Sequence, residues 1–196
     1  APELLNGLWR QAETRTVTSD GLALALAGDQ CAPGETTAMP SLPSLADGGG
    51  FTIDLWLTPD AQPSEQEIFN TRTRAGRGIS LSLLRTGVLR LTIADGALEQ
   101  LWESDPGLLS AGMLHHAAII VDGGPKIITF VIDGVLNDGG TFRPRGWSRF
   151  SSMLGNINGV TTLTIDPALM STLHTLRIYD RAVRTSEAVA NFQAMD

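Results

Sequence analysis

Residues 114–134 read LHHAAIIVDGGPKIITFVIDG, which is two apolar runs separated by Asp-Gly-Gly-Pro and closed by Asp-Gly. Side chains alternate between the two faces of a β-strand, so a run with apolar residues on both faces indicates a strand that is covered on both sides. Breaks rich in glycine are typical of hairpin turns. The stretch therefore predicts a central antiparallel hairpin whose first strand is buried on both faces.

Further strands are predicted on both sides of this hairpin, from short or alternating apolar runs between turn residues. Leu22, Leu24 and Leu26 alternate with small residues and are expected to face the core. Strands at intervals of about ten residues, with no helix between them, predict an all-β fold, a two-sheet antiparallel β-sandwich. The expected strands cover residues 6–19, 21–28, 36–39, 51–59, 67–71, 78–84, 87–94, 98–102, 153–154, 161–165 and 171–179.

One short helix is predicted at the C-terminus, after the last strand. Thr185 or Ser186 can cap it, because a hydroxyl oxygen accepts hydrogen bonds from the free backbone N–H groups of the first turn. Val189 and Phe192 lie on one side of the helix and are expected to dock on the sandwich.

The composition limits the classes of function. A net charge of -7 and a pI near 4.9 argue against nucleic acid as a partner, because phosphate binding needs clustered Lys and Arg. The single cysteine, Cys31, excludes an internal disulfide and is expected to be a small buried group. No apolar run is long enough to span a membrane. The first residues lack the pattern of a signal peptide, so the chain is expected to begin after one or inside a longer protein.

Five stretches, in the same order along the chain, resemble segments of the concanavalin A-like jelly rolls of the laminin G-like and pentraxin-like group. They are GLALALAGDQ (21–30), FTIDLWLTP (51–59), LHHAAIIVDG (114–123), FVIDGVL (130–136) and LHTLRIYDRAVRTSEAVANF (173–192). The resemblance implies a concanavalin A-like jelly roll with a short C-terminal helix. It also implies a single laminin G-like domain over residues 1–196, serving as one module of a larger protein.

The resemblance also bears on metal binding. In relatives that hold a structural calcium, an acidic residue of the closing strand and the loop after the opening strand tend to supply oxygen ligands. His174 stands at the acidic position, whereas Asp29 remains in the loop. Calcium takes about six to eight hard oxygen ligands, so the histidine argues against the site. No cofactor is expected, and Ca²⁺ is retained only as an option that would use Asp29.

The histidines are expected to be structural. His115 and His116 are adjacent in a predicted strand, so they point to opposite faces and cannot chelate one ion together. His174 is expected to share the core face of its strand with Leu176 and Ile178. Packing with one hydrogen-bonded ring nitrogen is the common role of such residues.

A glycoside hydrolase is an alternative, because β-glucanases share the architecture that the resemblance implies. A retaining enzyme needs two carboxyl groups about 5–5.5 Å apart, and those glucanases carry E-x-D-x-x-E on one strand face. The sequence has no such motif. Glu65 and Glu67 lie in a polar stretch, Asp54 is alone on its strand, and Glu99 and Glu103 are too far apart to form such a pair.

Tryptophan and arginine supply the candidate ligand-binding residues. Trp147 lies near Arg143 and Arg145 in a predicted loop, and Trp102 is a second candidate ring. An aromatic face complements the apolar C–H surface of a sugar, and arginine binds hydroxyl or acidic groups in bidentate fashion. Trp56 is expected to be structural. The alternative for the loop is a buried Trp147 that anchors it, with solvated arginines.

These observations predict a non-catalytic carbohydrate-binding or adhesion module, lectin-like, of an exported multidomain bacterial protein. Its expected partner is a polysaccharide or the glycan of a glycoprotein, and its expected location is extracellular, periplasmic or on the cell surface. A second hypothesis is a structural or protein-interaction domain packed on a neighbouring enzyme domain. The third is a glycoside hydrolase with unrecognised carboxylates.

Overall fold

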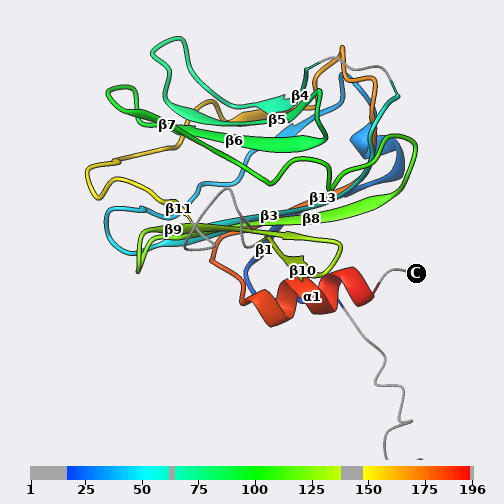
Figure 1. Cartoon of the computed structure of the whole chain (residues 1–196). Coiled ribbons are helices and arrows are strands. Elements are labelled where there is room, and N and C mark those ends of the chain that lie inside the picture. The colour runs from blue at the N-terminus through cyan, green and yellow to red at the C-terminus, as the bar shows by residue number, and fades with distance from the viewer. Residues whose placement is uncertain (1–16, 62–64, 138–147, 195–196) are drawn as a thin grey trace, which may run out of the picture.

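A computed structural model describes residues 17–61, 65–137 and 148–194, and Figure 1 shows two stacked antiparallel sheets with a helix on the outside of one of them. The central hairpin is present as predicted, because β8 and β9 pair antiparallel. The larger sheet has the order β1-β13-β3-β8-β9-β10, and β11 also pairs with β9. Its strands are β1 (Leu22–Ala27), β13 (Thr172–Tyr179), β3 (Gly50–Thr58), β8 (His115–Asp122), β9 (Ile127–Ile132), β10 (Val135–Leu136) and β11 (Ser148–Arg149).

The second sheet is a meander, in which each strand pairs with the next one along the chain. Short turns between consecutive strands explain this order, since antiparallel neighbours need only a tight connection. Its strands are β4 (Gln66–Asn70), β5 (Gly78–Leu84), β6 (Val88–Ala94) and β7 (Glu99–Glu103). A separate pair joins β2 (Thr36–Ala38) to β12 (Thr162–Thr164). The edge strand predicted within residues 6–19 falls largely outside the described residues.

The main core fills the space between the two sheets. On β3 the alternating residues Phe51, Ile53 and Leu55 face inward and are fully buried. They meet inner-face residues of the meander such as Leu81 and Leu91 in one apolar cluster. Burial of this kind is worth about 1.5–3 kcal/mol for each large apolar side chain, so the core is the main stabilising element of the sandwich.

The outer face of the larger sheet is covered by α1 (Thr185–Gln193), as Figure 1 shows. Ala118, Ile120 and Val131 of the central hairpin are buried there and belong to a second apolar cluster that includes residues of α1. Val189 packs against this cluster, and Phe192 is half-buried. The prediction that β8 is buried on both faces is therefore confirmed. No helix of the described chain is long and apolar enough to cross a membrane.

The helix cap differs from the prediction. Neither Thr185 nor Ser186 caps α1, because the helix begins one residue earlier than expected and its N-cap is Arg184. The cap hydrogen bond runs from the backbone N–H of Arg184 to the carboxylate of Glu187, at 2.7 Å. A carboxylate in the first turn also interacts favourably with the helix dipole.

Two further expectations are wrong in part. Leu26 is buried and Leu24 packs partly against the core, but Leu22 is 36% exposed. A register shift between Leu22 and Leu24 at the edge strand turns the first leucine outward. The strand predicted at 153–154 is a turn, although Leu154 is fully buried.

His174 does not face the core, contrary to the prediction. Leu173 pairs with Leu57 and Thr175 pairs with Trp56, so His174 is an extra residue in β13. A bulge of this kind shifts the alternation by one position and redirects a side chain. The ring of His174 is therefore exposed on the outer face of the sheet.

Candidate functional site

A polar network is buried on the outer face of the larger sheet, between β3, β8, β13 and α1. Asp54 points to this face because its neighbours on β3 point into the core, and its side chain is fully buried. Its Oδ1 accepts a hydrogen bond from Arg177 at 3.0 Å. Its Oδ2 accepts hydrogen bonds from Nε2 of His116 at 3.0 Å and from Nδ2 of Asn191 at 2.9 Å. A buried carboxylate is tolerated only with such compensation.

Asp54 remains ionised in this environment. Burial by itself would raise the pKa of its carboxyl group, but the hydrogen bonds from His116 and Asn191 and the charge of Arg177 lower that pKa below its usual value. All the contacts of the carboxylate are directed inward. We conclude that Asp54 holds four elements of the fold together and is not placed to transfer a proton to a ligand.

The same network ties the beginning of the described chain to the helix. The hydroxyl of Tyr179 donates to the carbonyl oxygen of Thr18 at 3.1 Å, and the backbone N–H of Thr18 donates to Oδ1 of Asn191 at 2.9 Å. Nδ2 of Asn191 also donates to the Tyr179 hydroxyl oxygen at 3.1 Å. Burial, together with the charge of Asp54, raises the pKa of Tyr179, so its hydroxyl keeps the proton that it donates.

The adjacent histidines point to opposite faces, as predicted. Nε2 of His115 accepts the backbone N–H of Ser110 at 2.9 Å, so the proton is on Nδ1, which donates to Asp133 at 2.7 Å. His116 is fully buried, and no described residue forms a hydrogen bond with its Nδ1. Both rings are held within the protein and have structural roles.

A cavity of about 380 Å³ lies beside this network. It opens on the outer face of the larger sheet next to the C-terminal end of α1, and we call it the helix-side pocket. Its lining consists of Val17, Trp56, Leu114, His174, Thr175, Arg177, Asn191 and Ala194. The pocket is thus formed where β3, β13, the residue before β8 and both ends of the described chain meet.

Apolar side chains form one wall of the helix-side pocket. Trp56 is only 7% exposed, and its ring stacks on Phe192 with centroids 5.8 Å apart and planes inclined by 20°. His116 packs against the same ring at 4.9 Å. Trp56 is therefore mainly structural, as predicted, and supports the pocket more than it offers a free ring face. Leu114, which is 44% exposed, extends the wall to the surface.

Three polar side chains of the pocket have unused hydrogen-bonding capacity. The hydroxyl oxygen of Thr175 is buried, and no described residue forms a hydrogen bond with it. His174 uses Nε2 in a 2.9 Å hydrogen bond with the Thr58 hydroxyl, which leaves its Nδ1 available. Arg177 contributes one terminal nitrogen to Asp54, and its guanidinium has further donors. Convergent polar groups on an apolar wall are characteristic of small-molecule sites.

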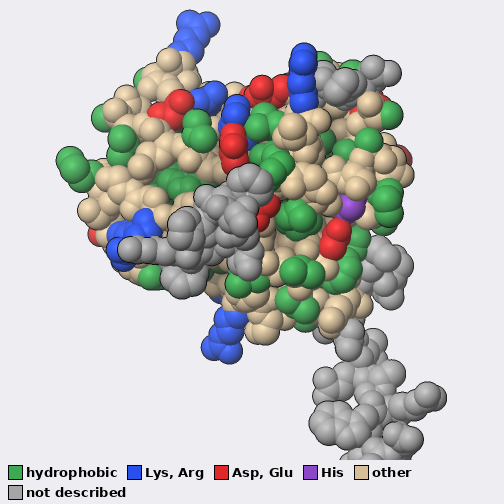
Figure 2. Space-filling model, in the orientation of Figure 1, with side chains coloured by type: hydrophobic (Ala, Val, Ile, Leu, Met, Phe, Trp, Pro, Cys, Tyr) green, Lys and Arg blue, Asp and Glu red, His purple; other side chains and the backbone are tan. Residues whose placement is uncertain are grey.

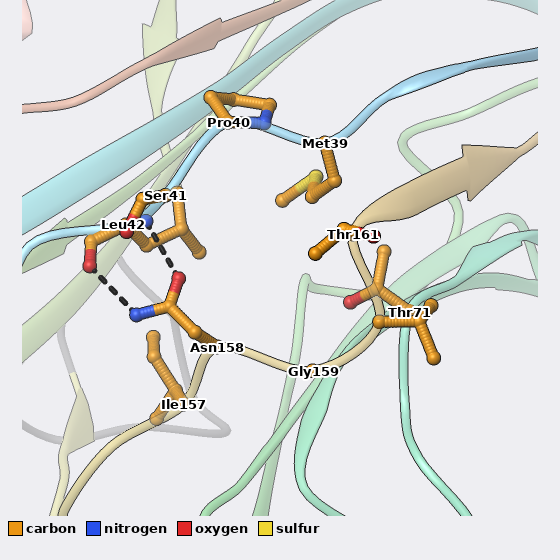
Figure 3. A pocket seen from close by; sticks show the side chains of 10 residues that line it. Met39, Pro40, Ser41, Leu42, Thr71, Ile157, Asn158, Gly159 and Thr161 are labelled. Carbon is orange, nitrogen blue, oxygen red and sulfur yellow. Dashed lines mark hydrogen bonds between the residues drawn. The ribbon is translucent and has the colours of Figure 1, made fainter.

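Figure 3 shows a smaller pocket of about 110 Å³, where residues 39–42 lie against residues 157–161. Asn158 spans the gap, because its Oδ1 accepts the N–H of Leu42 at 2.7 Å and its Nδ2 donates to the Leu42 carbonyl at 3.0 Å. The amide is thus occupied in joining two loops. We therefore interpret this pocket as a contact between two loops and not as a ligand site.

The structure describes only one of the four ligand-binding residues that the sequence indicated. Trp147, Arg143 and Arg145 lie outside the described residues, so their role stays a prediction. Trp102 is 6% exposed and belongs to the core, where its ring meets Phe150 edge-on with centroids 6.3 Å apart. A ring enclosed in this way has no face for a sugar, and we remove Trp102 from the candidates.

The possible calcium ligand and the cysteine lie at the end of β1. Asp29 is in the 3₁₀ turn η1 (Gly28–Cys31). Within residues 17–61, 65–137 and 148–194, no three His, Cys, Asp or Glu side chains are grouped so that they could hold a metal ion, and the use of Asp29 for Ca²⁺ stays a prediction. Cys31 is buried as expected, and burial raises the pKa of its thiol to about 11, so it is a poor nucleophile near neutral pH.

The family of the chain follows from its sequence. Residues 33–190 match the laminin G-type family Laminin_G_3, described as the concanavalin A-like lectin/glucanases superfamily. The match covers most of the chain, and the protein therefore belongs to this family, as the five resembling stretches implied. No curated protein matches the sequence.

The chain is similar in fold to several solved binding domains. The botulinum neurotoxin serotype D binding domain shares 10% sequence identity with a TM-score of 0.60, over 91% of this chain and 48% of that one. The carbohydrate-binding module CBM40 of the Ruminococcus gnavus IT-sialidase, bound to α2,3-sialyllactose, shares 12% identity with a TM-score of 0.60, over 87% of this chain and 98% of that one. The chain spans about half the length of the neurotoxin domains. At such identities these similarities show the fold alone.

Proposed function

We propose that this domain is a non-catalytic carbohydrate-binding module and that the helix-side pocket takes a saccharide unit. The observation that supports the proposal most is the buried Thr175 hydroxyl, which has no partner among the described residues and lines the same pocket as the unused guanidinium donors of Arg177 and the free ring nitrogen of His174. A buried hydroxyl without a partner is unfavourable, and a sugar hydroxyl would satisfy it. Leu114, supported by the largely buried Trp56, supplies the apolar wall that a sugar ring would contact.

The chemistry of the pocket favours binding over hydrolysis. Its described lining contains no carboxyl group, whereas glycoside hydrolysis generally requires a pair of them flanking the bond. Asp54 lies beneath the pocket but is ionised and fully hydrogen-bonded. The structural similarity to a sialidase binding module agrees with this class of function, although a shared fold is only an analogy.

The wider setting is part of the same proposal. Polysaccharides and glycoprotein glycans are mostly found outside the cytoplasm, so we place the protein in the extracellular space, the periplasm or on the cell surface. We further propose that the domain is an accessory module of an exported multidomain bacterial protein, where it would hold a partner domain close to its substrate.

The test is a pair of threonine substitutions measured on a panel of immobilised oligosaccharides that includes α2,3-sialyllactose. Thr175→Val removes the hydroxyl and keeps the side-chain shape, and we expect it to weaken binding about threefold to tenfold. Thr162→Val, at an exposed position of β12, is the matched control and should bind as the wild type does. Equal affinities of the two variants for a bound glycan would overturn the assignment to this pocket.

The loop that contains Trp147 is the alternative site of the same function. Trp147→Ala should abolish glycan binding, with little change in the melting temperature, if its ring stacks on the sugar. Binding that survives Trp147→Ala but not Thr175→Val would assign the ligand to the helix-side pocket. A large loss of stability would instead identify Trp147 as a buried anchor of its loop.

A specific surface feature favours the second candidate function, a domain that packs on a neighbouring domain. Met113, Leu114, Val135 and Leu136 are 59%, 44%, 68% and 44% exposed. The two segments lie on either side of the hydrogen bond between His115 and Asp133. Grouped exposed apolar side chains often mark protein contacts. Absence of binding across the whole panel would favour this function.

A further inference from the structure

Three arginines lie within six residues at the turn between β4 and β5. We call residues 72–77, with the sequence RTRAGR, the arginine hairpin. Arg72 forms an ion pair with Glu99 at 2.8 Å. Arg74 and Arg77 have no acidic partner among the residues that the structure describes, although the whole chain has a net charge of -7. This acidic protein therefore carries two arginines, three positions apart, that no described carboxylate neutralises.

The backbone of the arginine hairpin is held by hydrogen bonds on both sides of the turn. The N–H of Thr73 donates to the carbonyl of Arg77 at 2.8 Å, and the N–H of Gly76 donates to the carbonyl of Thr73 at 2.9 Å. Gly76 has φ +83°, a conformation that glycine adopts without strain. The neighbouring loop braces the base of the hairpin, because the N–H of Val160 donates to the carbonyl of Thr71 at 2.8 Å. Backbone hydrogen bonds thus hold the turn that carries the arginines in a defined conformation.

Two buried polar atoms of the hairpin lack partners in the described structure. They are Nε of Arg77 and the hydroxyl oxygen of Thr73. A backbone hydrogen bond from the N–H of Thr73 to the carbonyl of Arg77 joins the two residues across the turn. A buried donor of a charged group without an acceptor is costly, and an oxyanion is the acceptor that suits a guanidinium best.

A shallow cavity of about 170 Å³ separates the arginine hairpin from the turn between β6 and β7. Ala75 and Gly76 line it on one side and residues 94, 96–99 on the other. Lys and Arg side chains project at the upper left of Figure 2, where Figure 1 places these two turns. Apart from Leu98 and Glu99, which is paired with Arg72, the lining residues are small and leave room for a polymer to approach the backbone closely.

We propose that the arginine hairpin is a second binding site, which takes the carboxylate or sulfate groups of an acidic polysaccharide. Arg77 and the Thr73 hydroxyl would bind one oxyanion, and the exposed Arg74 would bind the next group along the polymer. Guanidinium groups bind such anions in bidentate fashion, which makes arginine more effective than lysine here. The site lies on the meander, away from the outer face of the larger sheet, so it is separate from the helix-side pocket.

The experiment compares two double variants with the same change in net charge. Arg74→Gln with Arg77→Gln neutralises the hairpin, whereas Arg85→Gln with Arg184→Gln neutralises two exposed arginines elsewhere. The probes are polygalacturonate for carboxylates and heparin for sulfates, each at about 0.02 M and about 0.15 M salt, because screening separates specific from diffuse attraction. Melting temperatures show that each variant is folded.

We expect the hairpin variant to bind polygalacturonate or heparin at least about tenfold more weakly, and the control variant to change less than about threefold. This expectation does not depend on the helix-side pocket, because none of the residues that line that pocket belongs to the arginine hairpin, so failure of that pocket would not affect the result. Equal losses in the two double variants would overturn the proposal, because they would indicate diffuse charge attraction. Absence of binding to both polymers at low salt would also overturn it. Single-stranded DNA serves as an unrelated polyanion, and wild-type binding to it that is as tight as binding to the two polysaccharides would overturn the proposal as well.

Discussion

On strand β3, Ile53 and Leu55 point into the core between the sheets, whereas Asp54, between them in sequence, points to the opposite face beneath α1. All three side chains are fully buried. Ile53 and Leu55 pack against other apolar side chains. Such packing tolerates different apolar residues of similar volume. Asp54 needs particular donors in particular places, and it finds them on His116, Arg177 and Asn191.

This difference shows how the fold and the candidate site depend on different information. The residues that face the core can be identified in each strand separately, from the alternation of apolar and polar residues in its sequence. The outer face depends on residues that are 62, 123 and 137 positions away from Asp54. The helix-side pocket borders this polar network and shares Arg177 and Asn191 with it. The pocket that we propose for a saccharide therefore shares residues with a network that stabilises the fold.

The largest expected effect is on the inner face. Phe130→Asp should unfold the domain, because Phe130 is 1% exposed and an unpaired carboxylate there would lose its hydration without gaining a partner. Far-UV circular dichroism and a thermal melt measure the outcome. Val135→Asp is the matched control on the next strand, where the side chain is 68% exposed, and it should stay folded. A stable, well-folded Phe130→Asp protein would contradict the two-sheet core.

A smaller but still large effect is expected on the outer face. Asp54→Ala should destabilise the fold by about 3–5 kcal/mol, because Arg177 and His116 would be left beneath α1 without their acceptor. Asp54→Asn keeps the shape of the side chain and one acceptor oxygen, so it should reduce the free energy of unfolding by less than Asp54→Ala does. Urea denaturation monitored by tryptophan fluorescence gives both values. A loss below about 1 kcal/mol for Asp54→Ala would show that the network contributes little to stability.

An effect of a few degrees is expected from the ion pair that holds the start of α1. The hydrogen bond from Arg181 lowers the pKa of Glu187 from its usual 4.5 to about 2. A lowered carboxyl pKa contributes stability above about pH 4.5, and that contribution is lost as the pH falls toward 2. Glu187→Gln should therefore melt about 2–4 °C lower than the wild type at pH 7. The difference should shrink below pH 4.5, and a difference that is constant with pH would exclude the charge as its cause.

The smallest effect is expected from metal removal. His174 occupies the position of the expected acidic ligand and points to the outer face, so a chelator should leave the melting temperature nearly unchanged. A metal that binds only the folded state would raise the melting temperature in proportion to its concentration. A rise of many degrees on addition of Ca²⁺ would indicate that Asp29 and other oxygen atoms form a site.

Most of the fold could be predicted from the sequence because it depends on local patterns. Alternation in residues 51–59 and 78–94, with glycine at the turns, was sufficient to place β3, β5 and β6. The errors occur where one residue interrupts the pattern. The bulge at His174 and the register shift after Leu22 are set by pairing with a neighbouring strand, and a single strand carries no signal for them.

The candidate site could not be predicted in the same way. Thr175 and Arg177 occur in an ordinary strand pattern, and only the bulge and the position of α1 bring them to one pocket with Trp56. Trp102 was chosen because tryptophan often binds sugars, but its burial depends on the packing of Phe150 from a distant segment. The arginine hairpin was visible as RTRAGR, yet its two polar atoms without partners are a property of the folded structure.

The most direct test of the account is to locate the bound glycan by nuclear magnetic resonance. An oligosaccharide that binds in the panel is titrated into the labelled domain, and changes in backbone amide shifts are assigned along the chain. The proposal predicts the largest changes at residues 174–177 of β13 and near Asn191, with small changes in the meander. Changes confined to residues 143–147, or to the arginine hairpin, would contradict the assignment of the sugar to the helix-side pocket.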